Sequence, residues 1–210
     1  MPDLATEMAE NAALIERFLD GYLTNADHAI LMGTPDRLLA AMRHGVLNGG
    51  KRLRPYLVRV VAGMFGVSPE ACVRAGAAIE LVHSYSLVHD DLPDMDNDAL
   101  RRGKPSVWAA FDPAMAILAG DALLTNAFHL LADEETHPDP AARIALVRSL
   151  SFRAGATGMV GGQVLDLAAE GRTLAIEVIS GHDDIRDPDP FPTAVDEGDV
   201  LAGERQYGAI

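Results

Sequence analysis

The stretch from residue 69 to residue 91 most constrains the fold, because it is apolar on nearly every side of a helix. A run of small residues at 75–78 would let neighbouring helices approach it closely. A helix without a polar face has to be surrounded by protein, so the stretch predicts a central buried helix. The low aromatic content, 5%, and the many Ala, Leu and Val residues also favour helices over sheets.

Helical spacing continues on both sides of this stretch. Apolar residues recur three and four positions apart, and Pro and Gly residues mark the expected ends. No strand pattern competes with the helices, so we expect an all-α fold. Helices are expected over residues 4–31, over 35–47, from Pro55 onward, over 113–133 and over 139–170.

The character of the chain changes near residue 180. Residues 181–210 hold eight acidic residues against two arginines, and three prolines fall within 188–192. Such a composition does not support a packed core. We therefore expect a helical domain at residues 1–180 and an irregular acidic tail at 181–210.

Charge and composition exclude several kinds of partner. The net charge of −14 argues against nucleic acid, which needs a basic surface. A single cysteine, Cys72, excludes internal disulfides and fits a reducing compartment. The sequence shows no signal-peptide pattern and no apolar run of about 18 residues. We expect a cytoplasmic protein without stable membrane insertion.

Carboxylates gather at the end of the central helix, where residues 89–96 read HDDLPDMD. Carboxylates at this density repel one another unless a divalent cation lies between them. His83 and Asp90 share one stripe of a straight helix, because seven residues make almost two turns. Asp96 would join Asp90 only if the chain bends near Pro93. A solvated helix end is the plainer alternative, and the apolar helix before it disfavours that reading.

Two basic segments accompany the carboxylates. Residues 49–55 read GGKRLRP and residues 100–105 read LRRGKP, and together they hold six of the seventeen Lys and Arg residues. Cations at a helix N-terminus are disfavoured by the helix dipole unless an anion binds among them. A nonspecific basic loop is the alternative for residues 49–55. Together with the carboxylates, the segments predict a magnesium-diphosphate site.

Weaker signals lie further along the chain. Four glycines at 155–162 interrupt an expected helix, and either a ligand or another helix could require their close approach. Gln163 and Asp166 share a face and could contact metal-bound water. Asp121 lies in an apolar run, where a buried cap or a paired charge is the expected role.

Four segments in this order resemble the trans-polyprenyl diphosphate synthases, in particular the bacterial members that form farnesyl diphosphate. They are residues 49–55, 83–93, 100–105 and 161–163, and the resemblance covers roughly residues 10–178. It implies an isoprenoid-synthase-type helical bundle around a central cavity, usually homodimeric. It also implies a transferase of isoprenoid biosynthesis that joins isopentenyl diphosphate to an allylic diphosphate with Mg²⁺.

The resemblance further implies roles for individual residues. Asp90 and Asp96 correspond to the magnesium ligands, and Asp91 to a supporting carboxylate. Arg101 corresponds to the residue that holds the allylic diphosphate, and these four form the expected catalytic group. The expected isopentenyl diphosphate site consists of Lys51, Arg54, His83 and Arg102.

Product length is expected to depend on Tyr85 and Ser86, which precede the carboxylates. Tyr85 lies about 7.5 Å along the helix from Asp90, where a growing prenyl chain would meet the cavity wall. A bulky aromatic residue here resembles the enzymes that make farnesyl diphosphate. The resemblance therefore implies a C15 product.

The family pattern stops after about residue 178, and we expect a truncation or frameshift there. The second aspartate-rich motif of the family does not follow, and the carboxylates at 183–187 come too early to replace it. The main alternative is therefore a catalytically impaired member that binds diphosphate or pairs with a complete subunit. A metal phosphohydrolase would leave GGKRLRP unexplained, and a terpene cyclase would not need a second diphosphate site.

Overall fold

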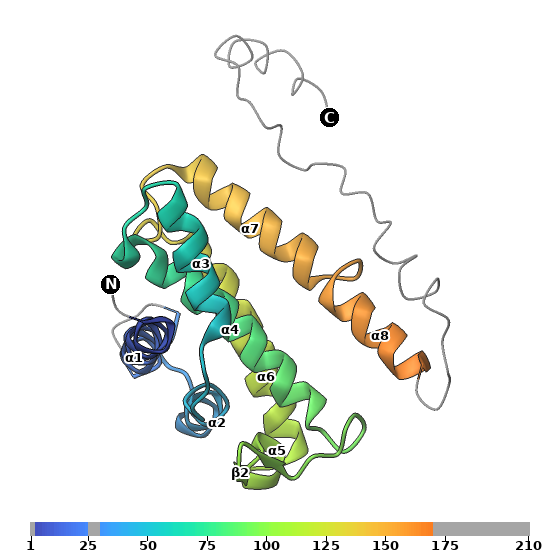
Figure 1. Ribbon diagram of the computed structural model, residues 1–210. Coiled ribbons are helices and arrows are strands. Elements are labelled where there is room, and N and C mark those ends of the chain that lie inside the picture. Colours follow the sequence, from blue (N-terminus) through green and yellow to red (C-terminus); the bar gives the residue numbers. More distant parts are fainter. Residues whose placement is uncertain (1–2, 25–29, 170–210) are drawn as a thin grey trace. The chain divides into compact units, whose positions relative to one another are not determined.

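The computed structural model describes residues 3–24 and 30–169, and Figure 1 shows that this part is built almost entirely of helices. The all-α prediction is confirmed. The chain divides into two units between residues 154 and 155, and each is described by itself. The domain boundary expected near residue 180, and the acidic tail after it, lie outside the described residues.

The first unit is organised around helix α4 (Pro69–Asp90). The side chain of Ser68 caps its N-terminus by accepting a hydrogen bond from the Ala71 N–H, and Pro69 occupies the first turn. Residues on all sides of the helix are buried, among them Ala77 and Leu81. The predicted central helix is confirmed.

In the part of this unit that the structure describes, six further helices and a small hairpin accompany α4. Helix α6 packs most extensively on α4, and the two run side by side in Figure 1. Helices α3, α1 and α2 also contact α4. The elements are α1 (Leu4–Tyr22), α2 (Asp36–Val46), α3 (Leu53–Met64), β1 (Leu100–Arg101), β2 (Lys104–Pro105), α5 (Val107–Ala110), α6 (Pro113–Ala132) and α7 (Pro140–Ala154).

Two features of this unit differ from the sequence analysis. Helix α1 ends at Tyr22 rather than near residue 31, with Leu23 at its C-cap. Strands β1 and β2 pair antiparallel, with Leu100 opposite Pro105, although no strand was expected. Two-residue strands are too short to show an alternating pattern in the sequence.

Helix α6 passes the length and composition test for a membrane-crossing helix, although polar residues such as Asp121 and Asn126 interrupt its apolar sequence. The mean hydropathy of its 18-residue window is 1.4, and 44% of that window is buried. Buried core helices have the same composition, and α6 contacts α4, α2, α5 and α7. Among the described residues α6 is the one helix of this kind, which is weak evidence for contact with a membrane.

The second unit, as far as it is described, contains helix α8 (Met159–Ala169). The single helix expected over residues 139–170 is therefore wrong, because the chain turns at residues 155–158. The Gly158 N–H donates to the Gly155 carbonyl over 3.0 Å in that turn. A Cβ at Gly161 would overlap the Ala156 carbonyl oxygen, so the turn itself requires a glycine there.

Candidate diphosphate-binding site

The backbone at the end of α4 brings the first and last carboxylates of the acidic segment together. The Asp96 N–H donates to the Asp90 carbonyl over 2.8 Å. The Met95 and Asn97 N–H groups both donate to the Leu92 carbonyl, which closes the turn. The bend expected near Pro93 is thus present, and Asp96 returns to the end of the helix that Asp90 terminates.

Asp90 and Asp96 repel each other electrostatically. Burial, and next the nearby Asp96 carboxylate, raise the pKa of Asp90, while Arg101 acts in the opposite direction. Mg²⁺ is commonly held by one or two carboxylates together with substrate phosphates and water, so this pair fits that ion. The described residues contain no group of three or more His, Cys, Asp or Glu placed to hold a metal.

Asp91 differs from its two neighbours because it is buried and paired with a cation. Its carboxylate accepts a hydrogen bond from Arg101 Nε at 3.0 Å and another from Arg101 Nη2. This bond raises the pKa of the Arg101 guanidinium, which remains 29% exposed. Asp91 therefore supports the site by fixing Arg101, rather than by adding a third free carboxylate.

The basic residues form a separate pocket of about 290 Å³ at the N-terminus of α3. All four residues predicted for isopentenyl diphosphate line it, although they come from three separate segments of the chain. The lining residues are Gly50, Lys51, Arg52, Leu53, Arg54, Glu80, His83 and Arg102.

Positive charge dominates this basic pocket, in which Glu80 is the single acidic lining residue. Burial, and next the Arg54 cation, lower the pKa of His83. Burial, and next Arg52, lower the pKa of Arg102. The cations in this pocket repel one another, and a bound anion would relieve that repulsion. The pocket therefore suits an anion with several negative charges, such as a diphosphate.

A close backbone approach brings Arg102 into the basic pocket. Arg102 lies at the turn between β1 and β2 with a positive φ of 54°, and Gly50 has a φ of 130°. A Cβ at Gly50 would overlap the Arg102 guanidinium. The Asn48 side chain donates to the Arg101 carbonyl over 3.1 Å, which fastens the hairpin to the segment after α2.

Arg52 has a different environment from the other cations of the GGKRLRP segment. Its side chain is 1% exposed, and Nη1 donates to Glu80 Oε1 over 2.7 Å. The pattern of residues 49–55 predicts cations that bind an anion, and it does not indicate this ion pair between Arg52 and Glu80. A signal was present, because Glu80 is the one Asp, Glu, Lys or Arg between Arg74 and Asp90 and a buried acid needs a partner.

The residues expected to limit product length lie in the last turns of α4. Tyr85 is buried, and its ring meets that of His89 edge-on at 5.7 Å. The Ser86 hydroxyl donates to the His83 carbonyl over 3.0 Å.

Asp121, expected to be buried or paired, lies 3.9 Å from His89 Nε2 but is 62% exposed. Of the two roles expected for Asp121, the buried cap is wrong, whereas the contact with His89 agrees with a paired charge.

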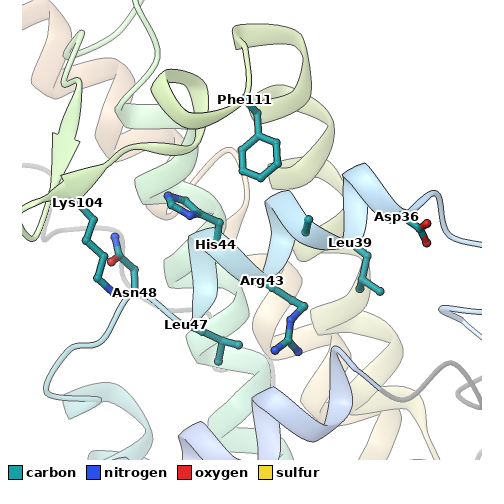
Figure 2. Close-up of a pocket in the computed structure, with 9 residues that line it drawn as sticks. Asp36, Leu39, Arg43, His44, Leu47, Asn48, Lys104 and Phe111 are labelled. Carbon is teal, nitrogen blue, oxygen red and sulfur yellow. The ribbon is translucent and has the colours of Figure 1, made fainter.

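A larger hollow of about 570 Å³ lies along α2 and contains none of the predicted site residues. Figure 2 shows His44, Lys104 and Phe111 around it. Two of its polar side chains already have partners: His44 Nε2 lies 2.7 Å from the Pro105 carbonyl, and Arg43 pairs with Asp20 at 2.6 Å. We therefore assign the anion site to the basic pocket.

Gln163 and Asp166 lie on α8, in the second unit, and their role stays a prediction.

Comparison with known proteins identifies the family of this chain. Residues 35–187 match the polyprenyl synthetase family, so the chain belongs to that family. Farnesyl diphosphate synthase of Bacillus subtilis is 42% identical over 175 residues, which are 83% of this chain and 57% of that protein. The Escherichia coli farnesyl diphosphate synthase is 43% identical over 174 residues, which are 82% and 58% of the two chains.

Solved structures show the same relationship. An FPP/GFPP synthase from Zymomonas mobilis has 47% identity and a TM-score of 0.72, over 80% of this chain and 59% of that one. A geranyltransferase from Legionella pneumophila has 36% identity and a TM-score of 0.75, over 83% and 60%. The chain spans somewhat more than half the length of these relatives.

Proposed function

We propose that this chain is a trans-prenyltransferase that joins isopentenyl diphosphate to an allylic diphosphate, dimethylallyl or geranyl. The observation that carries the proposal is the separation of two sites with different chemistry. Lys51, Arg54, His83 and Arg102 line a cationic pocket, while Asp90 and Asp96 meet at the end of α4. Membership of the polyprenyl synthetase family supports the same reaction class.

The two sites divide the work of the reaction. Lys51, Arg54, His83 and Arg102 bind the diphosphate of the isopentenyl substrate and orient its alkene. Arg101, held by Asp91, binds the allylic diphosphate, and Asp90 and Asp96 would hold Mg²⁺ against it. When bound, Mg²⁺ supplies positive charge that neutralises the leaving diphosphate.

The bond changes follow from this arrangement. The allylic carbon–oxygen bond breaks, the alkene carbon of the isopentenyl unit forms the new carbon–carbon bond, and a proton leaves. The diphosphate of the allylic substrate is the leaving group. Dense positive charge around it is the main catalytic device.

Farnesyl diphosphate is the product that the site favours. Tyr85 is buried in α4, five residues before Asp90. Its ring would block further growth of the prenyl chain of the product. Tyr85→Ala should therefore lengthen the products, as measured by chromatography of the dephosphorylated prenols. The matched change Ser86→Ala removes only a hydroxyl and should shift the products less.

We also propose a homodimer in the cytoplasm, on the resemblance to the family.

The experiment for this proposal combines binding with turnover. Lys51→Ala should weaken isopentenyl diphosphate binding in calorimetry by about tenfold, the effect of losing one charge-assisted contact. Lys104→Ala is the matched control, because Lys104 belongs to the second basic segment but does not line the basic pocket. Steady-state assay with isopentenyl and geranyl diphosphates should then yield farnesyl diphosphate. Equal affinities of the two variants would contradict the assignment of the pocket.

A further inference from the structure

Arg52 joins three helices beneath the basic pocket. Its Nη1 donates to Glu80 Oε1 of α4 over 2.7 Å. Its Nη2 donates to the carbonyl of Val46, the last residue of α2, over 2.8 Å and lies 3.3 Å from Glu16 Oε1 of α1. A cation at the C-terminus of α2 also complements the helix dipole. A single guanidinium therefore connects α1, α2 and α4 at the point where α3 begins.

The backbone of Arg52 has an unfavourable conformation. Its φ of 48° and ψ of 43° place it in the left-handed region, which non-glycine residues rarely adopt. Such a conformation persists only where its surroundings hold it in place. The Asn11 side chain lies within 3.4 Å of the Arg52 carbonyl and adds a further contact.

This residue lies between two of the predicted anion ligands. Lys51 precedes it, and Arg54 follows two positions later in the first turn of α3. Because Arg52 fixes the turn at which α3 starts, the direction of both neighbouring cations depends on its side chain. A change in this turn would move Lys51 and Arg54 relative to His83, which α4 carries independently.

We propose that Arg52 is a positioning residue whose buried ion pair with Glu80 holds Lys51 and Arg54 in place for the diphosphate of isopentenyl diphosphate. The inference rests on the proposed function of the basic pocket. The alternative is a purely electrostatic role, in which Arg52 adds positive charge to the pocket and Glu80 reduces it. The two roles predict opposite effects when Glu80 is neutralised.

Replacing Glu80 and Glu16 separately distinguishes these roles. Both carboxylates contact Arg52, and Glu80→Met and Glu16→Met each remove one negative charge. If only charge matters, both variants should bind isopentenyl diphosphate more tightly. Positioning predicts that Glu80→Met weakens binding by about tenfold, because the turn loses its buried anchor. Glu16→Met should bind at least as well as the unchanged protein, since Glu16 is 43% exposed and its contact is longer.

The double variant Arg52→Met/Glu80→Met separates positioning from stability. It leaves the net charge of the pocket unchanged, and replacing a buried ion pair with apolar residues of similar volume is often neutral for folding. The double variant leaves no unpaired charge of this ion pair, so we expect a higher melting temperature than for Glu80→Met and affinity for isopentenyl diphosphate reduced by about tenfold. Magnesium-dependent bisphosphonate binding, which uses Asp90 and Asp96, should not change. Unchanged affinity for isopentenyl diphosphate in the double variant would overturn the proposal.

Arg52→Lys provides a test that does not depend on the double variant folding. Lysine keeps the charge but cannot bond to Glu80 and the Val46 carbonyl with the same planar fork. Positioning predicts weaker binding of isopentenyl diphosphate, and affinity equal to the unchanged protein would contradict it. If the unchanged protein does not bind isopentenyl diphosphate at all, the proposed function itself fails, and the inference fails with it.

Discussion

Individual side chains in the two sites are held in environments that oppose their charge. Burial and Asp96 raise the pKa of Asp90, and burial and Arg54 lower the pKa of His83. A protein without a bound ligand gains nothing from either arrangement. Both become favourable when a cation reaches the carboxylates and an anion reaches the basic pocket.

Asp90→Asn should stabilise the protein in the absence of metal. The folded pKa of Asp90 lies above its ordinary value of 3.8, so its contribution to stability is present below that value and is lost as the pH rises through the raised pKa. At neutral pH the neutral amide removes this penalty, and we expect the melting temperature to rise by about 1–3 °C. Differential scanning calorimetry at low salt measures this.

Asp94→Asn is the matched control for Asp90→Asn. It lies in the same segment and removes the same charge, but Asp94 is exposed. The melting temperature of Asp94→Asn should change less than that of Asp90→Asn. In the presence of a bisphosphonate, Mg²⁺ should raise the melting temperature of Asp94→Asn, whereas it should not raise that of Asp90→Asn. A lower melting temperature for Asp90→Asn would show that Asp90 is structural.

Binding of isopentenyl diphosphate should be accompanied by proton uptake at His83. The pKa of His83 in the free protein lies below its ordinary value of 6.5, and a bound diphosphate favours the protonated imidazole. Affinity should therefore rise as the pH falls through the pKa that His83 has in the complex. Calorimetry in buffers of different ionisation enthalpy counts the protons. His83→Gln corrects for protonation of the ligand itself, and equal proton uptake in both proteins would rule out this role.

At the scale of elements, sequence patterns predicted long helices better than the breaks between them. Helix α4 could be predicted because its apolar character extends over many turns. The split between α7 and α8 was missed, since glycines inside an apolar run are consistent with either a helix or a turn. The ion pairs Arg52–Glu80 and Asp91–Arg101 were missed because each joins two different elements, over 28 and 10 positions, and the periodicity of a single helix does not report such contacts.

The contact between the β1–β2 turn and the segment after α2 is testable with two glycines. Gly50→Ala should weaken isopentenyl diphosphate binding by about tenfold, because a Cβ there would displace the Arg102 guanidinium. Gly49→Ala is the control for backbone strain, since Gly49 also has a positive φ but has open space beside it. Calorimetry compares the two variants, and equal losses would show that strain rather than Arg102 is responsible.

At the scale of the whole molecule, a chain with a net charge of −14 assembles a pocket dominated by cations. The resemblance to the polyprenyl synthetases predicted which residues would come together there, and the folded chain brings four of them to one pocket. The other site is acidic, because it consists of the Asp90 and Asp96 carboxylates at the end of α4. We therefore propose that the chain has two diphosphate sites, of which one depends on Mg²⁺ and the other on side-chain cations.

Titration calorimetry with and without a chelator tests this claim most directly. A bisphosphonate should bind only when Mg²⁺ is present, because its site is formed by the carboxylates of Asp90 and Asp96. Isopentenyl diphosphate should bind with nearly the same affinity in both conditions, because Lys51, Arg54 and Arg102 supply its positive charge. Bisphosphonate binding that persists in the chelator, or isopentenyl diphosphate binding that is lost in it, would contradict the account of two distinct sites.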